Sequence, residues 1–181
     1  MSVYENIITS LNEAVDYAKG KNTNARTETV IITQAHESET FGLSALDVAK
    51  WLIAYNNSQN NADYLTPLKL QKLLYYAQGV SLKYTGKTLF TESIYAWQLG
   101  PVVTEVYNKY KSYGRNQIDE QIDLPEFENN NVNAILQDVY EDYGQFSAWK
   151  LVDMTHSEPT WKDTPIDAII TISKMKAFFG R

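Results

Sequence analysis

The segment from Thr66 to Tyr84 constrains the fold of this chain most, because it predicts a helix that is apolar on nearly every side. Thr66 suits a capping position, and Pro67 suits the first helical position, where its missing N–H is not needed. Gly86 breaks the predicted helix. Its apolar side chains are Leu68, Leu70, Leu73, Leu74, Tyr75, Tyr76, Ala77, Val80 and Leu82. Such a helix is normally buried at the centre of a domain.

The rest of the chain predicts further helices and only a few strands. Apolar periodicity predicts helices over residues 3–19, 45–57, 102–112, 126–143, 148–157 and 172–179. Pro101 is predicted to begin the helix over 102–112, and Ser173 is predicted to begin the helix over 172–179. Strand composition marks residues 27–34 and 92–98, with a short strand within 114–124, whereas 35–43 and 157–165 are predicted loops. We therefore predict a mainly α (α+β) fold: a compact multi-helix domain around the central helix, with a small antiparallel β element.

Two segments are predicted along the chain, with their boundary after residue 43. Residues 1–43 combine a helix, a polar turn and a strand, which is too little material for a hydrophobic core of their own. They are predicted to form an appendage that packs on the main domain, on another copy or on a partner, and so a second binding element. Residues 44–181 form the main helical domain, and Ser44 suits the N-cap of its first helix.

Composition excludes several classes of function. The net charge of −6 disfavours nucleic acid as a partner, because phosphate binding needs gathered Lys and Arg, and it favours a basic partner instead. The absence of cysteine excludes disulfides and thiolate chemistry. No apolar run is long enough for a membrane span, and the first residues lack the pattern of a signal peptide. We expect a cytoplasmic protein without a membrane partner, and a homo-oligomer stays open.

The sequence contains few residues in patterns that suggest catalysis. Of the two histidines, His156 lies at a predicted helix end, where it can bond the last carbonyls, and this structural role is favoured. A hydrolase using His156 with Glu158 or Asp153 is an alternative, but no nucleophile motif supports it. No glycine-rich phosphate loop occurs either. We therefore predict a protein that is not an enzyme and that needs no cofactor or metal.

Polar residues inside the apolar central helix are the stronger candidates for function. Lys69 and Lys72 share one helix face, since they are three residues apart. They either form the only solvent-facing stripe of that helix or make a fixed polar contact at a partner surface. The turn from Trp97 through Gly100 and Pro101 is either a packing corner, which we favour, or a recognition edge.

Three motifs carry a resemblance to a known family. The segments LTPLKLQKLLYYAQG, IYAWQLGPVVTEVYNKY and SAWKLVDMTHSEPTW occur in that order within residues 46–179, which resemble the Panacea domain, also called the SocA-like domain, of bacterial and phage-associated antitoxins. The loop after Glu158 departs from the family pattern because it is short and contains Pro159. The N-terminal segment is similar to the leader that precedes helix-turn-helix domains in other antitoxins.

The resemblance implies a helical, non-enzymatic protein that neutralises a cognate protein toxin by direct contact. One lineage of the family acts as a proteolytic adaptor that delivers its toxin to ClpXP, an AAA+ protease, and this is an alternative here. A DNA-binding autoregulator is disfavoured by the charge. The residues predicted to bind the partner are Lys69, Gln71, Lys72, Tyr75, Tyr76, Trp97, Gly100, Pro101, His156 and Trp161.

Overall fold

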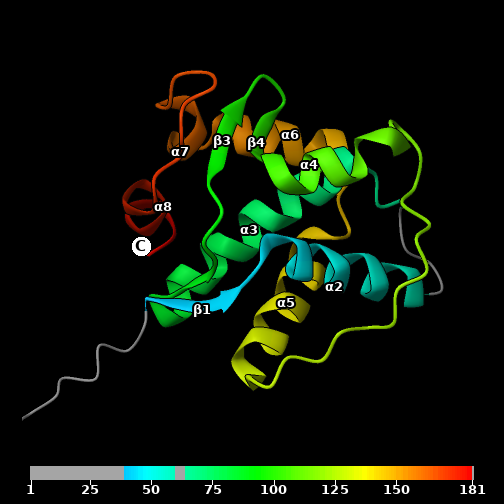
Figure 1. Cartoon of the computed structure of the whole chain (residues 1–181). Helices are drawn as coiled ribbons and strands as arrows, with labels where there is room; N and C mark the ends of the chain where they lie inside the picture. The colour runs from blue at the N-terminus through cyan, green and yellow to red at the C-terminus, as the bar shows by residue number, and fades with distance from the viewer. Residues whose placement is uncertain (1–38, 60–63, 181) are drawn as a thin grey trace, which may run out of the picture. The chain divides into compact units, whose positions relative to one another are not determined.

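The computed structural model of the chain describes residues 39–59 and 64–180. The predicted helix over 3–19 and strand over 27–34 lie outside the described residues. The described part contains seven α-helices and a small antiparallel sheet, which confirms the predicted mainly α class. The elements in chain order are β1 (Thr40–Leu43), α2 (Ala45–Ser58), α3 (Pro67–Thr85), β2 (Thr88–Phe90), β3 (Ile94–Trp97), β4 (Gly100–Val103), α4 (Thr104–Tyr110), the 3-10 helix η1 (Lys111–Tyr113), α5 (Asn130–Tyr143), α6 (Ala148–Ser157), α7 (Pro159–Lys162) and α8 (Ile172–Phe179) (Figure 1).

Helix α3 begins and ends where the sequence signals predict. The Thr66 side chain accepts a hydrogen bond from the Lys69 backbone N–H, Pro67 occupies the first turn, and Gly86 ends the helix in the left-handed conformation at φ 70°. Every residue from 69 to 82 is buried. The local capping signals therefore define this helix, and the apolar pattern explains its burial.

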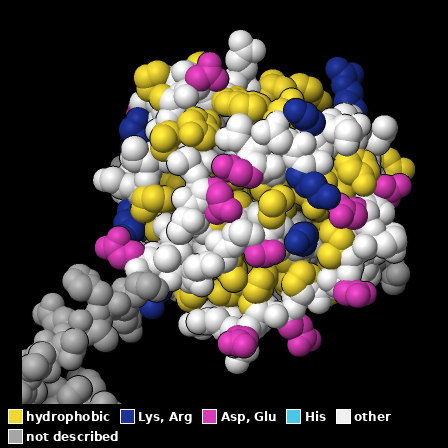
Figure 2. Space-filling view, viewed as in Figure 1, with side chains coloured by type: hydrophobic (Ala, Val, Ile, Leu, Met, Phe, Trp, Pro, Cys, Tyr) yellow, Lys and Arg dark blue, Asp and Glu magenta, His cyan; other side chains and the backbone are white. Residues whose placement is uncertain are grey.

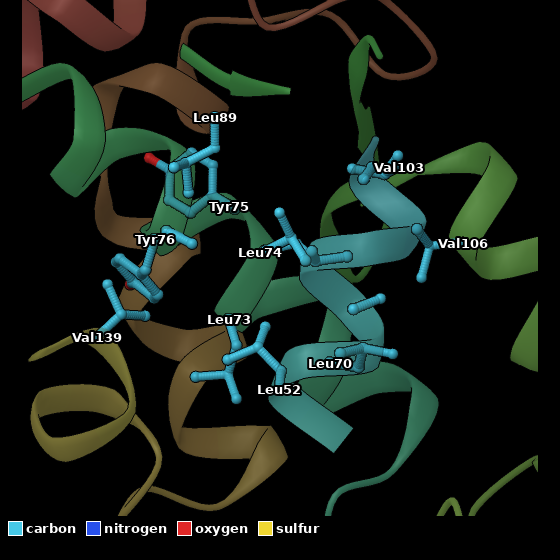
Figure 3. Packing of buried hydrophobic residues seen from close by; sticks show 14 of the residues in the cluster. Leu52, Leu70, Leu73, Leu74, Tyr75, Tyr76, Leu89, Val103, Val106 and Val139 are labelled. Carbon is cyan, nitrogen blue, oxygen red and sulfur yellow. The ribbon is translucent and has the colours of Figure 1, made fainter. Parts of the chain in front are cut away.

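The other elements pack around α3 on several sides. Helix α3 contacts α2, α4, α5, α6 and α8 as well as strands β2 and β4. Figure 3 shows apolar side chains from these elements converging on its leucines and tyrosines: Leu52, Leu89, Val103, Val106 and Val139. The predicted central helix is confirmed, and the core of the domain lies around it.

Strands β3 and β4 form the antiparallel element that the sequence predicts. Ile94 pairs with Val103 and Trp97 pairs with Gly100, so Gln98 and Leu99 form a two-residue turn. The predicted strand over 92–98 is therefore confirmed, but Pro101 was expected to begin a helix and instead lies within β4. Proline fits there because its carbonyl can still accept a hydrogen bond although it lacks an N–H. Helix α4 begins three residues later, at Thr104.

A second strand pair is parallel and was not predicted. Thr40 of β1 pairs with Thr88 of β2, and Leu43 pairs with Phe90. The predicted loop over 35–43 is therefore wrong at residues 40–43, where four residues form β1. Strand β2 has only three residues, which is too short for a period-two pattern to be recognised in sequence.

An irregular segment after α7 extends the hairpin on its free edge. The Ile170 N–H donates to the Ile94 carbonyl, the Ala96 N–H donates to the Ala168 carbonyl, and the Asp167 N–H donates to the Ala96 carbonyl, all at 2.8–2.9 Å. Residues 167–170 therefore satisfy backbone groups of β3 that would otherwise be exposed at an edge. Asp167 adopts a positive φ of 64°, a conformation that aspartate tolerates better than most residues.

Four further sequence predictions are wrong in detail. No strand forms within 114–124; the backbone there is irregular, and the Ile118 N–H donates to the Leu65 carbonyl instead. The predicted loop over 157–165 contains the short helix α7, which includes Trp161 and starts at Pro159, a residue favoured in a first turn. Helix α8 is capped by Thr171 and not by Ser173, and α5 starts at residue 130, not 126.

Candidate partner-binding groove

Two polar side chains of α3 hold strand β4 through its backbone. The Lys72 ammonium donates to the Pro101 carbonyl at 2.9 Å, and the Gln71 side-chain carbonyl accepts from the Val103 N–H at 2.7 Å. Both contacts are buried, where an unpaired polar group is costly. The polar residues that interrupt the apolar helix therefore point inward and fix the β3–β4 hairpin.

The same arrangement recurs at strand β2, which belongs to the other, parallel strand pair. The Gln78 side chain accepts from the Leu89 N–H at 2.8 Å and donates to the Phe90 carbonyl at 2.9 Å, while the Ser81 hydroxyl donates to the Lys87 carbonyl. Helix α3 thus supplies hydrogen-bond partners to strand β2 as well as to β4. The short strands depend on this helix for groups that a wider sheet would satisfy by strand pairing.

Lys72 is a buried cation. Its side chain, like that of Lys69, is 0% exposed, so the first of the two alternatives for these lysines, a solvent-facing stripe, is wrong. Burial lowers the pKa of Lys72 to about 7, because the low-dielectric interior disfavours the charged ammonium. The carbonyl of Pro101 compensates only part of the lost hydration.

Gly100 allows this contact by the absence of a side chain. Its φ is +101°, and a Cβ at this position would lie 2.8 Å from Cε of Lys72 and 2.8 Å from Oγ1 of Thr155. A side chain would therefore collide with both α3 and α6. Glycine is required here for backbone conformation and for close approach.

Glu158 links the α6–α7 junction to α3. The Tyr75 hydroxyl donates to one carboxylate oxygen at 2.6 Å, and the Tyr76 hydroxyl donates to the other at 2.8 Å. The Tyr75 hydroxyl also bonds the Thr160 hydroxyl. Burial raises the pKa of Glu158, although the two tyrosine hydrogen bonds act in the opposite direction. The two tyrosines of the family motif therefore bind a carboxylate within the domain.

Trp161 and His156 complete the contact between α6–α7 and the hairpin. The Trp161 indole N–H donates to the Trp97 carbonyl at 2.9 Å. The His156 ring stacks on Trp161, with ring centroids 3.9 Å apart. Burial first, and then the nearby Lys72 charge, lower the pKa of His156. His156 is therefore favoured in the neutral form at neutral pH.

Nine of the ten predicted partner-binding residues thus gather at the hairpin and the α6–α7 junction, and the tenth, Lys69, is buried in α3. Most of the ten face inward. Those on α3, together with Gly100 and Pro101, are buried, whereas Trp97, His156 and Trp161 are half-buried. Their predicted role as direct contacts stays a prediction. The observed contacts assign a positioning role to all of them except Lys69, because these nine residues fix the backbone and rings around the hairpin.

The hydrolase alternative requires a carboxylate of Glu158 or Asp153 directed at His156, and the structure shows a different arrangement. Both carboxylate oxygens of Glu158 accept hydrogen bonds from tyrosines, so neither is directed at His156. Nε2 of His156 is buried and has no hydrogen-bond partner among the described residues. Asp153 is exposed. In the described part of the chain, no three His, Asp or Glu side chains are arranged to hold a metal ion.

Next to the hairpin lies a groove of about 780 Å³, which we call the hairpin groove. It is lined by the start of α3, the hairpin, α4, η1, the start of α6 and the loop after α7: Thr66, Pro67, Leu68, Gln71, Trp97, Gln98, Leu99, Val102, Tyr107, Lys111, Gly114, Arg115, Ala148, Trp149, Ile166 and Asp167. Three of these are large apolar side chains that solvent reaches freely: Leu99 is 46%, Trp149 61% and Ile166 49% exposed. Because exposed apolar side chains that gather in one place are a feature of interaction surfaces, this groove is the candidate binding site.

The exposed lining residues could be found in the sequence only in part. Trp149 lies within the predicted helix over 148–157, but Leu151, Val152 and Thr155 form the buried face of α6. Trp149 precedes Leu151 by two residues, which turns it away from that face, so the helical period does provide a signal. Leu99 and Ile166 lie in a turn and a loop, where no periodicity distinguishes exposed from buried positions.

Residues 70–162, just over half of the chain, match the family described as the antitoxin SocA-like, Panacea domain. No curated protein and no solved structure matches. In the part of the chain that the structure describes, no helix combines the length and apolar character needed to cross a bilayer.

The fold is thus a helical domain with a hairpin fixed by hydrogen bonds to its backbone and with an exposed apolar groove beside it. The chain belongs to the antitoxin SocA-like Panacea domain family. Membership supports a role in a toxin–antitoxin system, with a toxin as partner, and it favours a non-enzymatic role. The matched range is narrower than the predicted resemblance over 46–179, and it includes the hairpin, α4, α6 and α7.

Proposed function

We propose that this protein is an antitoxin that neutralises a cognate protein toxin by binding it directly at the hairpin groove. The observation that carries the proposal is the convergence of Leu99, Trp149 and Ile166 at one groove of a family member. Burial of such side chains against a partner is the main favourable term in protein association. Tryptophan is also enriched among the residues that dominate binding energy.

The rigidity of the groove supports the proposal further. The hairpin that forms one wall is fixed through Lys72, Gln71 and Trp161, each of which bonds its backbone. A groove that is already ordered loses little conformational entropy when a partner binds. The predicted site residues act in this proposal by holding the groove in shape, while the exposed side chains make the contact.

Replacing Trp149 with alanine is expected to weaken toxin binding about tenfold, because truncating an exposed aromatic anchor typically costs more than about 1 kcal/mol. The fold should remain intact, since the side chain is 61% exposed. The measurement is the dissociation constant for the toxin encoded beside the gene, together with rescue of growth on co-expression. Tyr84→Ala is the matched control, because Tyr84 is 65% exposed and does not line the groove.

Two outcomes of this experiment, and one further measurement on the wild-type protein, bear on the proposal. Loss of rescue in Trp149→Ala with an unchanged melting temperature supports it. Equal rescue by Trp149→Ala and Tyr84→Ala contradicts the groove as the binding site. If the wild-type protein shortens the half-life of the toxin in cells only when ClpXP is present, delivery to the protease replaces sequestration as the mechanism.

A further inference from the structure

The charged residues of the hairpin groove differ in sign from the chain as a whole. The chain carries a net charge of −6, but the groove is lined by Lys111 and Arg115 with one carboxylate, that of Asp167. Lys111 donates to the Asn108 side chain at 3.0 Å. Among residues 39–59 and 64–180, neither Lys111 nor Arg115 forms an ion pair. Both cations are exposed and available to a partner.

The two signs of charge come from segments on opposite sides of the hairpin. Lys111 and Arg115 follow α4, whereas Asp167 lies in the loop after α7, and these two segments flank the hairpin on either side in Figure 1. On the face of the molecule that Figure 2 shows, Lys and Arg side chains are interspersed with Asp and Glu, and no broad area of one sign is visible. Lys111 and Arg115, two exposed cations without an ion-pair partner among the described residues, thus lie beside the apolar side chains of the groove.

We propose that the hairpin groove binds an acidic amphipathic segment of the toxin, an inference that rests on the proposed function. The apolar face of that segment contacts Leu99, Trp149 and Ile166, as in other grooves that receive an amphipathic helix. Carboxylates beside that face pair with Lys111 and Arg115. Asp167 repels a carboxylate on the other side, so the charges also set the direction in which the segment lies.

A protein segment fits this groove better than a nucleic acid. Single-stranded nucleic acid is bound by a basic channel that follows its backbone, with aromatic rings stacking on successive bases. Here only two cations line the groove, and only one of its aromatic rings, that of Trp149, is freely exposed. The rings of Trp97 and Tyr107 are half-buried and pack edge-to-face on each other, and the remaining apolar lining is mainly aliphatic, from Leu99, Ile166 and Val102. Aliphatic side chains next to a few cations match the apolar and acidic faces of an amphipathic peptide.

The test uses the full chain and overlapping synthetic peptides that tile the toxin neutralised in the co-expression experiment. We expect the tightest peptides to be acidic and amphipathic. The double variant Lys111→Glu/Arg115→Glu should bind them about tenfold more weakly, because each attraction becomes a repulsion. Raising the salt concentration should weaken wild-type binding, since the charges are exposed. The control Lys83→Glu/Lys176→Glu changes the net charge equally at exposed lysines outside the groove.

Several results would overturn the inference while leaving the proposed function standing. These are tight peptides that lack carboxylates, equal binding by the two double variants, or neutralisation of the whole toxin without binding of any tiled peptide. Displacement of the peptides by single-stranded oligonucleotide at equal concentration would instead assign the groove to nucleic acid. If the wild-type protein does not neutralise the toxin, the proposed function fails first, and the inference falls with it.

Discussion

Replacing Gly100 with alanine is expected to destabilise the protein by about 3 kcal/mol, the sum of an unfavourable backbone conformation and of overpacking. The Cβ would stand 2.8 Å from both Lys72 and Thr155, which are buried side chains of two different helices. If Lys72 moved away, it would lose its hydrogen bond to the Pro101 carbonyl, and if Thr155 moved away, it would lose its hydrogen bond to the Val152 carbonyl within α6. The free energy of unfolding, measured with a chemical denaturant, provides the test.

Gly86→Ala is the matched control for this prediction. Gly86 also has a positive φ, +70°, but open space surrounds the position where a Cβ would lie. It should therefore show only the conformational cost, about 1 kcal/mol. Equal destabilisation by the two substitutions would show that the close approach of Lys72 to Gly100 contributes nothing to the requirement for glycine.

The stability of the protein is expected to rise by about 2 kcal/mol between about pH 7 and about pH 9 through Lys72 alone. The pKa of Lys72 is about 7 in the folded state and near 10.5 in the unfolded chain. Over this window the unfolded state binds more protons than the folded state, so raising the pH favours folding. The unfavourable effect of the buried charge is fully present below pH 7 and disappears as the pH approaches the unfolded pKa.

The Lys72→Met variant isolates this effect, because methionine has a similar shape and does not titrate. Its unfolding free energy should lack the rise of about 2 kcal/mol over the same pH range, whereas Lys83→Met, at an exposed lysine, should retain it. Parallel pH profiles for wild type and Lys72→Met would contradict the prediction. Above about pH 10 both proteins should lose stability, because burial raises the pKa of Tyr75 and Tyr76 and only the unfolded chain then ionises them.

The central helix could be predicted from sequence because its signals are local. Thr66, Pro67 and Gly86 act on their own backbone and on the residues next to them, so capping chemistry is sufficient to place both ends of α3. The burial of this helix followed from its all-round apolar composition. Helix α7 had a comparable local signal in Pro159, but its four residues are too few for a periodic pattern to support it.

The role of the polar residues on α3 could not be predicted in the same way. Gln71 and Lys72 interrupt an apolar pattern, and the sequence indicates only that they are unusual. Their partners, Val103 and Pro101, lie about thirty residues further along the chain and contribute backbone groups. Nearly every residue type has the same backbone N–H and carbonyl groups, so the sequence contains no motif that identifies these partners. The groove could not be predicted from sequence for the same reason, since its lining residues come from segments that only the tertiary fold brings together.

The hydrogen bonds that fix the hairpin all end on its backbone: at the Trp97 and Pro101 carbonyls and at the Val103 N–H. Such contacts do not depend on which side chains the turn carries. The turn residues Gln98 and Leu99 can therefore be exchanged without loss of the anchors on either side. Substitutions at a few surface positions could in this way change which toxin a member of the family binds, while the fold and its stability stay the same.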